Sequence, residues 1–216
     1  MHDLDPFIKE NKASKIRLPL KAATIHYYPK FIPKVTASRY FETLLNSTAW
    51  QQDSIKLFGK THPQPRLTAM YGMEGNTYSY SGITMHPKPF EEIHFTIKEA
   101  LEKVCNIDFT TVLLNLYRNG NDSNGWHSDD EKELGRQPTI ASLSFGEDRI
   151  FQLKEKACSQ STFKLTLAHG SLLLMQGETQ HKWLHQLPKS KRIQQPRINL
   201  TFRRIFQTNG SVPSKK

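Results

Sequence analysis

The sequence predicts an α+β domain in which helices come first and a jelly roll follows. Before residue 110, two segments carry apolar residues at helical spacing. After it, six short β-rich segments are separated by Gly, Pro, Asn and Asp. The chain has 216 residues, of which 37% are hydrophobic, and this is enough for one globular domain with its own core.

Two helices are predicted ahead of the strands. The first covers residues 36–46, where pairs of apolar residues recur at helical spacing and Thr36 is a candidate N-cap. The second follows Pro87 and Pro89 and has two glutamates in its first turn. Its apolar residues recur every three or four positions and predict a stripe that covers a sheet. They are Phe90, Ile93, Ile97, Leu101 and Val104.

The predicted strands place a jelly-roll core at 111–206, after a helical part at 21–110. Residues 1–20 are basic without a clear period, and residues 207–216 are rich in Gly, Ser, Pro and Lys, so both are expected to be flexible. The loop at 119–125, rich in Asn and Gly, is also expected to be mobile. The six strands are 111–117, 139–145, 150–153, 162–167, 171–175 and 197–206.

The charge of the chain favours a phosphate-rich partner. Lys and Arg number 30 and Asp and Glu 20, which gives a net charge of +10. The longest apolar run is 172–175, and the first six residues lack the apolar core of a signal peptide. We therefore expect no membrane partner and a cytoplasmic location in a bacterium or a nuclear one in a eukaryote. Two cysteines cannot form a disulfide framework.

Two predicted strands have one unusually polar face. In 197–203 every second side chain is apolar, and the others are two arginines, an asparagine and a threonine. In 111–117, Asn115 and Tyr117 share a face in the same way. On an exposed sheet these faces would meet water. If they meet inside a barrel, the buried guanidiniums require an anion, because an unpaired buried charge costs on the order of several kcal/mol. A small dicarboxylate would satisfy them.

A candidate metal site begins at His127 and Asp129, which project to the same side of an extended segment. A third ligand could come from His169, His181 or His185. Two histidines and one carboxylate leave open metal positions, as in non-haem Fe(II) oxygenases, where a chelating cosubstrate and O2 must both bind. The HxD spacing alone is weak evidence because it often occurs by chance.

Six segments together resemble the AlkB-type Fe(II)/2-oxoglutarate dioxygenases and occur in the order of that family. They are NLY at 115–117, HSDDE at 127–131, ASLSFG at 141–146, HGSLL at 169–173, WLH at 183–185 and RINLTFR at 197–203. Upstream, FGK at 58–60 and YSYSG at 78–82 resemble the nucleotide-recognition elements of the branch that repairs double-stranded DNA, the human AlkB homologue two type. The implied fold is a double-stranded β-helix with N-terminal helices and a nucleotide-recognition lid.

The resemblance implies roles for individual residues. Fe(II) would be held by His127, Asp129 and His185, which leaves His169 and His181 as structural residues. Arg197 is expected to bind the distal carboxylate of 2-oxoglutarate, because its planar fork suits a carboxylate. The full set of cosubstrate residues implied is Asn115, Tyr117, Arg197, Thr201 and Arg203, with Asn199 on the same face by alternation.

The resemblance also implies a substrate, an alkylated base in DNA, which must be flipped out of a duplex to react. Tyr78 and Tyr80, with Ser79 between them, resemble the base-stacking pair, and Phe58, beside Gly59 and Lys60, resembles the wedge that fills the vacated stack. Asp130 and Glu131 are expected to read the cationic edge of an N-methylated base. Without the family, these aromatics would more simply pack a core and these carboxylates would be solvated. Candidate phosphate contacts are Lys60, Arg66, Lys154, Lys156, Lys189 and Arg192.

The sequence therefore predicts a monomeric DNA demethylase that uses Fe(II), 2-oxoglutarate and O2. It would act on 1-methyladenine and 3-methylcytosine, release formaldehyde, succinate and CO2, and so repair alkylated DNA. Double-stranded DNA is the expected partner, with single-stranded DNA or RNA open. Two alternatives remain: a 2-oxoglutarate-dependent hydroxylase or demethylase acting on RNA, protein or a small molecule, and a non-catalytic basic nucleic-acid binder, against which the intact ligand set argues.

Overall fold

A computed structural model describes residues 15–57, 59–73, 78–80, 83–85, 87–158 and 161–206. An eight-stranded sheet contains β1 (Ile16–Arg17), β2 (Thr24–Tyr28), β5 (Leu67–Gly72), β8 (Lys88–Pro89), β9 (Thr111–Tyr117), β11 (Ile140–Gly146), β14 (Ser171–Gln176) and β16 (Arg197–Arg203). A four-stranded sheet contains β10 (Asn124–His127), β12 (Arg149–Glu155), β13 (Phe163–Leu167) and β15 (Trp183–Leu187). The helices are α2 (Lys34–Ser47), α3 (Glu92–Cys105), α4 (Thr179–Lys182) and the 3-10 helix η1 (Lys132–Leu134).

The two sheets form the predicted double-stranded β-helix. The large sheet has the order β1-β2-β14-β11-β16-β9-β5-β8, and the small sheet has the order β10-β15-β12-β13. The chain passes between the sheets repeatedly from β9 to β16, so that each sheet receives four of these eight strands. All six predicted strands exist, the one at 111–117 with the predicted ends and the other five with shifted ends. The sequence did not predict β10 and β15, which are short and mix polar with apolar residues.

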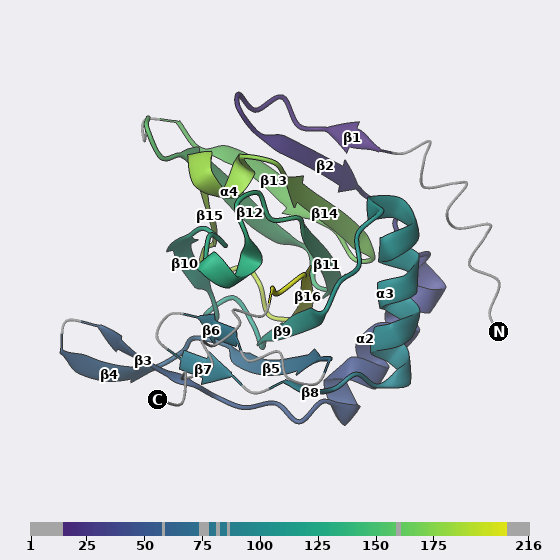
Figure 1. Cartoon of the computed structure of the whole chain (residues 1–216). Coiled ribbons are helices and arrows are strands. Elements are labelled where there is room, and N and C mark those ends of the chain that lie inside the picture. The colour runs from purple at the N-terminus through teal and green to yellow at the C-terminus, as the bar shows by residue number, and fades with distance from the viewer. Residues whose placement is uncertain are drawn as a thin grey trace, which may run out of the picture.

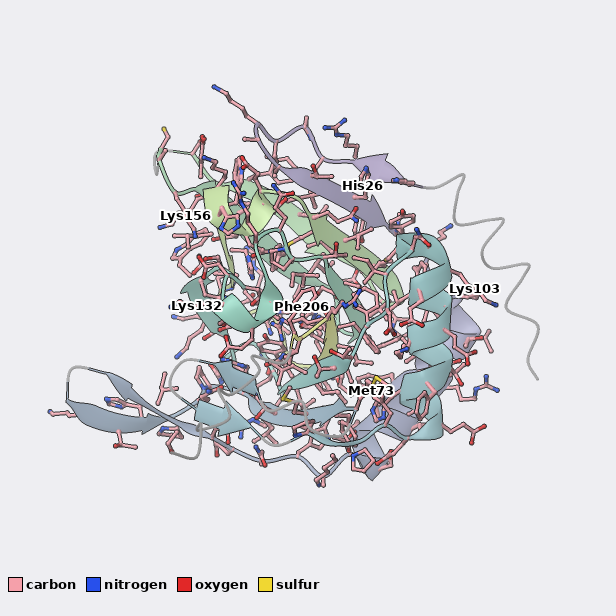
Figure 2. All side chains as sticks on the ribbon, in the orientation of Figure 1. His26, Met73, Lys103, Lys132, Lys156 and Phe206 are labelled. Atoms are coloured by element: carbon pink, nitrogen blue, oxygen red, sulfur yellow. The ribbon has the colours of Figure 1, made fainter. Side chains whose placement is uncertain are left out.

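Alternation along the central strands separates two hydrophobic cores. On β16, Ile198, Leu200 and Phe202 pack toward α2 and α3, which cover the side of the large sheet away from the small one (Figure 1). The opposite side chains of β16 face the space between the sheets, where a second core contains residues of β12, β13 and β15. Side chains fill the interior, whereas residues such as Lys103 on α3 point outward (Figure 2). The candidate site lies between the sheets.

The helices begin at different residues from those predicted. α2 starts at Lys34, and Pro33 accepts its first intrahelical bond from Ala37 N at 2.8 Å, so Thr36 lies inside the helix and is not its N-cap. Pro33 has an extended backbone and is the last residue before the helix. Because a proline is compatible with the start of a helix, α2 can begin directly after it. α3 is preceded by Glu91, whose capping box uses His94 at the third helical position.

The predicted boundary between a flexible start and the folded domain lies too late in the chain. β1 pairs with β2 through Ile16 and Arg17, and Leu18 is only 5% exposed in the core between the sheets. β2 in turn lies between β1 and β14, so the predicted helical part supplies strands to the large sheet. Residues 1–14 and 207–216 lie outside the described residues. No helix in the described part of the chain has the length and apolar character needed to cross a membrane.

Two hairpins lie at the lower left of Figure 1, level with β5 and β8 of the large sheet. β3 (Ser54–Leu57) pairs with β4 (Lys60–Pro63), with Leu57 opposite Lys60 and Gly59 at φ +77° between them. The left-handed φ favours glycine at this turn. β6 (Tyr78–Tyr80) pairs with β7 (Ile83–Met85), Tyr78 lying opposite Met85. These hairpins carry the segments that resemble nucleotide-recognition elements.

Candidate active site

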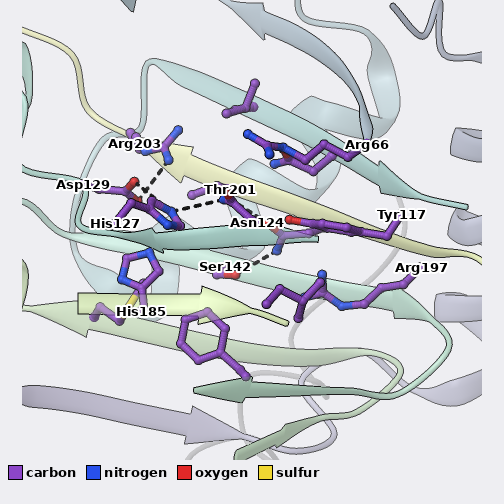
Figure 3. Close-up of a pocket in the computed structure, with 16 residues that line it drawn as sticks. Arg66, Tyr117, Asn124, His127, Asp129, Ser142, His185, Arg197, Thr201 and Arg203 are labelled. Atoms are coloured by element: carbon purple, nitrogen blue, oxygen red, sulfur yellow. Dashed lines mark hydrogen bonds and ion pairs between the residues drawn. The ribbon is translucent and has the colours of Figure 1, made fainter. Parts of the chain in front are cut away.

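A polar pocket opens between the two sheets. β9 and β16 are adjacent, with Asn115 opposite Asn199 and Tyr117 opposite Arg197, so the polar faces of both strands meet there as the alternation predicted. Figure 3 shows the histidines and Asp129 at one end of the pocket and Tyr117 and Arg197 at the other. The lining residues are Arg66, Leu113, Asn115, Tyr117, Asn124, His127, Asp129, Ser142, Phe151, Met175, His185, Leu187, Arg197, Asn199, Thr201 and Arg203.

His127, Asp129 and His185 form a cluster suited to a metal ion. β10 pairs with β15 so that His127 lies opposite His185, and Asp129 follows two residues after His127. One ligand atom from each of the three residues lies within 4.8 Å of the others. Asp129 and His185 are buried, at 2% and 5% exposure. The structure therefore brings together the three residues that the resemblance selected.

Hydrogen bonds orient the imidazole of His127. Its Nδ1 lies 2.7 Å from the carbonyl oxygen of Gly125, so Nδ1–H donates and Nε2 carries the lone pair. Nε2 lies 3.2 Å from Nδ2 of Asn124 and 4.0 Å from Oδ1 of Asp129. A backbone acceptor at the remote ring nitrogen is the usual way in which a ligating histidine is held in its tautomer.

The carboxylate of Asp129 has one paired oxygen and one buried oxygen without a hydrogen bond. Oδ2 lies 3.0 Å from Nη2 of Arg203, and the Asp129 backbone N–H donates to Oε1 of Gln180 at 3.0 Å. Oδ1 receives no hydrogen bond from the described residues, although it is buried. Burial alone would raise the pKa of Asp129, but the charges of Arg203, His185 and His127 outweigh it and lower that pKa to about 2. The group is therefore an anion whose Oδ1 is available to a cation.

Both histidines of the cluster are neutral near neutral pH. Burial lowers the pKa of His185 to about 3, with a further contribution from His127. Burial also lowers the pKa of His127, against the opposing effect of Asp129. Two neutral imidazoles and one carboxylate form the donor set of a facial triad, so these residues fit Fe(II).

Arg197 lies at the other end of the pocket and is 2% exposed. Its Nη2 donates to Oγ of Ser144 at 2.8 Å, and its Cζ lies 5.3 Å from the centre of the Tyr117 ring. Within the described residues, no carboxylate forms an ion pair with it and its buried Nε has no hydrogen-bond partner. Burial lowers its pKa to about 10, so the guanidinium stays charged at neutral pH. A carboxylate ligand would supply the missing partner.

The polar atoms of Asn199 are used within the protein. Its Nδ2 donates to Oγ of Ser142 at 2.8 Å and to the carbonyl oxygen of Leu143 at 2.9 Å, while its Oδ1 accepts from Oγ1 of Thr201 at 2.9 Å. Asn199 therefore orients Thr201 and anchors β16 to β11.

Arg66 was expected to contact phosphate, and the structure corrects this. Its side chain is buried inside the pocket at 5% exposure, with Nε donating to Oδ1 of Asn115 at 2.8 Å. Because Oδ1 is used in this way, the Nδ2 group of Asn115 is the one left for a ligand. The position of Arg66 just before β5 is the signal that could have predicted its place in the pocket. β5 is a neighbour of β9, and Thr68 of β5 lies opposite Asn115 of β9.

Two of the predicted substrate residues, Asp130 and Glu131, have described side chains that lie outside this pocket. Asp130 is exposed and pairs with Lys156, whose Nζ lies 2.9 Å from Oδ2. Neither Asp130 nor Glu131 is among the described residues that line the pocket. Gly59 and Lys60 are exposed at the turn of the β3–β4 hairpin, and Tyr78, Ser79 and Tyr80 form β6. Phe58 lies outside the described residues.

The other predicted candidates lie away from the cluster. His169 Nδ1 accepts the Gly146 N–H at 2.9 Å, and the His181 ring hydrogen-bonds to the carbonyl oxygen of Arg136. The ammonium of Lys154, a candidate phosphate contact, lies 4.4 Å from the centre of the Trp126 ring. Lys189 and Arg192 line a separate surface hollow.

The chain matches known proteins over most of its length. Residues 24–203 match the model of the 2OG-Fe(II) oxygenase superfamily. The chain is 39% identical over 204 residues to the human "Alpha-ketoglutarate-dependent dioxygenase alkB homolog 3", covering 90% of this chain and 71% of that protein. It is 42% identical over 161 residues to the human "DNA oxidative demethylase ALKBH2", covering 71% of this chain and 62% of that protein. These similar identities do not assign the chain to either type.

A solved structure confirms the fold independently of sequence identity. "The structure of OsALKBH1" superposes with a TM-score of 0.64 at 14% identity, covering 88% of this chain and 99% of that one. Its identity is too low to carry anything beyond the fold. The family match over 24–203 and the human relatives show that this chain belongs to the 2OG-Fe(II) oxygenase superfamily and is an AlkB-type dioxygenase that depends on Fe(II), 2-oxoglutarate and O2.

Proposed function

We propose that this enzyme removes N-methyl groups from bases in DNA, with 1-methyladenine and 3-methylcytosine as its lesions, and so repairs alkylated DNA. One observation carries the proposal: the same pocket contains two complementary binding sites. At one end the buried Oδ1 of Asp129 lies beside two neutral imidazoles, and at the other end the buried Arg197 lacks a carboxylate partner. A human relative named as a DNA oxidative demethylase and the net charge of +10 support DNA as the substrate.

In this proposal His127, Asp129 and His185 hold Fe(II). When bound, Fe(II) and 2-oxoglutarate use O2 to convert the N-methyl group to N-hydroxymethyl while 2-oxoglutarate becomes succinate and CO2, and the hydroxymethyl group then leaves as formaldehyde. Gly125 fixes the tautomer of His127 through Nδ1, and Arg203 holds Oδ2 of Asp129 so that Oδ1 faces the histidines.

The cosubstrate would lie along the polar face of β9 and β16. Arg197 would bind the distal carboxylate through the N–H groups that Ser144 leaves available, beside the Tyr117 ring. Asn115 would donate from Nδ2, since Arg66 already occupies its Oδ1. Thr201, oriented by Asn199, and Arg203 complete the set.

The base would be recognised by the two hairpins and by the acidic residues after Asp129. Tyr78 and Tyr80, with Ser79 between them, would stack the flipped base, and Phe58, supported by Gly59 and Lys60, would fill the gap in the duplex. Asp130 and Glu131 would meet the cationic edge of the methylated base. Since Oδ2 of Asp130 is paired with Lys156 at 2.9 Å, a base that engages that oxygen would compete with the lysine.

Formaldehyde release from duplex and single-stranded oligonucleotides that carry the same lesion tests the proposed wedge. Phe58→Ala should lower the rate on the duplex more than on the single strand, because only the duplex has a gap to fill. Phe95→Ala, at a 48% exposed position on α3, serves as the matched control and should change neither rate. An equal loss on both substrates would reject the wedge role.

The proposed partner is alkylated DNA, preferably double-stranded, and the proposed state is a monomer. The enzyme would work where that DNA lies, which is the nucleus of a eukaryote or the cytoplasm of a bacterium. Turnover of methylated RNA in preference to DNA would contradict this assignment.

A further inference from the structure

Arg149, the first residue of β12, is a buried cation for which the proposed chemistry has no use. Its side chain is 2% exposed, and within the described residues it forms no ion pair with a carboxylate. Instead its guanidinium donates to three main-chain carbonyl oxygens: Asn119 at 3.3 Å, Asp122 at 3.0 Å and Pro188 at 2.8 Å. A buried charge that is satisfied only by backbone oxygens fixes the segments that carry those oxygens.

The three carbonyl groups belong to two loops that are joined to each other. The first loop follows β9 and the second follows β15. Gly120 N donates to the carbonyl oxygen of Ile193 at 3.0 Å, and Ser190 N donates to that of Gly120 at 2.8 Å. A Cβ at Gly120 would lie 1.7 Å from the carbonyl oxygen of Ser190, so the loops meet at van der Waals contact. Arg149 therefore holds both loops as one unit.

The first loop was expected to be mobile, and its hydrogen bonds show a compact structure instead. Asp122 accepts from the backbone N–H of Arg118 at 2.9 Å and from its guanidinium at 2.8 and 2.9 Å. Ser123 N donates to the carbonyl oxygen of Pro65 at 2.9 Å. Gly120, one of the residues that suggested mobility, allows the close contact with Ser190 instead.

This unit borders the pocket at two points. The Arg149 Cζ lies 5.8 Å from the centre of the Tyr117 ring, which also receives Arg197. At the end of the loop, Asn124 and Gly125 contact the two ring nitrogens of His127. A displacement of the loop would thus move both the phenol beside Arg197 and the groups that orient His127.

We propose that Arg149 is a positioning residue for 2-oxoglutarate. Its hydrogen bonds connect both loops to β12 next to Tyr117, and they thereby hold Tyr117 and Arg197 in the geometry that binds the cosubstrate. This inference rests on the proposed roles of Tyr117 and Arg197. A planar guanidinium with five donors can reach three carbonyl groups at once, whereas a lysine ammonium at the end of a flexible chain cannot hold the same arrangement.

The test measures binding of 2-oxoglutarate to protein loaded with Mn(II), by calorimetry, together with KM for 2-oxoglutarate and kcat. Arg149→Met should weaken binding and raise KM about tenfold, since small displacements in a positioned site have effects of this size or larger. Its kcat at saturating 2-oxoglutarate should stay close to that of the wild type. Lys164→Met is the matched control, because Lys164 is an exposed cation lining the same surface hollow as Arg149.

Arg149→Lys separates geometry from charge and retains the aliphatic stem if Arg149→Met fails to fold. It should bind 2-oxoglutarate more weakly than the wild type, because the charge remains but the three-carbonyl contact does not. Wild-type affinity in Arg149→Lys, or in a folded Arg149→Met, would overturn the positioning role. A lower kcat with unchanged KM would also overturn it, since that result indicates only a smaller folded fraction.

The variant Arg197→Met distinguishes an error in the role of Arg149 from an error in the proposed 2-oxoglutarate pocket. If Arg197→Met loses 2-oxoglutarate binding and Arg149→Met keeps it, the inference alone is wrong. If Arg197→Met binds 2-oxoglutarate like the wild type, the assigned pocket is wrong, and the inference falls with it.

Discussion

Nη2 of Arg203 lies 3.0 Å from Oδ2 of Asp129, and this ion pair leaves Oδ1 of the same carboxylate 4.0 Å from Nε2 of His127. Arg203 and Asp129 face each other because β16 directs every second side chain into the space between the sheets. The pair joins the two halves of the site: Arg203 is on the cosubstrate strand and Asp129 is in the metal cluster. A buried ion pair of this kind orients its carboxylate more than it stabilises the fold.

Asp129→Ala should reduce turnover to background, because the variant lacks the anionic ligand and the ion pair with Arg203. Mn(II) binding by calorimetry and formaldehyde release are the two measurements. Asp108→Ala is the control, since Asp108 is an exposed carboxylate paired with Lys98 on α3. Iron-dependent turnover at the wild-type rate in Asp129→Ala would refute the ligand assignment.

Arg197→Met should make the ligand-free protein more stable while removing its response to 2-oxoglutarate. The variant replaces a buried guanidinium that has no carboxylate partner with an apolar chain, which removes an uncompensated buried charge; replacing whole buried ion pairs by apolar residues is neutral or stabilising by about 1–4 kcal/mol. Thermal unfolding with and without 2-oxoglutarate measures both effects, because a ligand stabilises the state that binds it. A less stable variant that 2-oxoglutarate still stabilises would contradict the assignment.

The fold should be less stable in mild acid because His94 is buried as a neutral imidazole. His94 is 0% exposed, stacks on Tyr71 with ring centroids 4.1 Å apart, and burial lowers its pKa from 6.5 to about 4. Above pH 6.5 both the folded and unfolded states hold a neutral imidazole, so the full stability is present. As the pH falls from 6.5 to 4, only the unfolded state takes up the proton, which removes about 3 kcal/mol from the free energy of unfolding.

Chemical denaturation of the wild type and His94→Gln between pH 4 and 7 measures this effect. Gln at this position can still accept from the Glu91 N–H, which His94 Nδ1 accepts at 3.2 Å, so the helix cap is kept. The variant should lose less stability than the wild type over that range. Parallel curves for the two proteins would exclude His94 as the titrating group.

Gly120→Ala should destabilise the fold, whereas Gly125→Ala should not. A Cβ at Gly120 meets the carbonyl oxygen of Ser190 at 1.7 Å, and a Cβ at Gly125 meets nothing within 4 Å. Forcing backbone apart at a close contact costs about 1–3 kcal/mol. Denaturant titration of both variants gives the comparison, and equal stabilities would show that the two loops can separate without cost.

The features that sequence predicted well depend on local periodicity. Alternation in 111–117 and 197–203 was enough to place Tyr117, Arg197 and Arg203 on one buried polar face, because the side-chain direction in a strand follows from its period of two. The HxD spacing predicted that His127 and Asp129 share a side. Selection of His185 over His169 and His181 needed the family, since the residues alone left all three open.

What sequence did not predict depends on contacts between distant segments. Arg66 and Asn115 are 49 residues apart and meet only because β5 pairs with β9. The 119–125 loop reads as mobile from its composition, and its order comes from Arg149 and the loop after β15. The end of the flexible N-terminal segment was predicted too late in the chain because β1 has only two residues, which are too few for a periodic signal.

The most direct measurement of the central proposal is formaldehyde release from a duplex that carries one 1-methyladenine, with Fe(II), 2-oxoglutarate, ascorbate and air. We predict release that requires both iron and 2-oxoglutarate and that is lost in Asp129→Ala. Iron-dependent formation of succinate without formaldehyde from this duplex would contradict the proposed substrate while leaving the enzyme a dioxygenase.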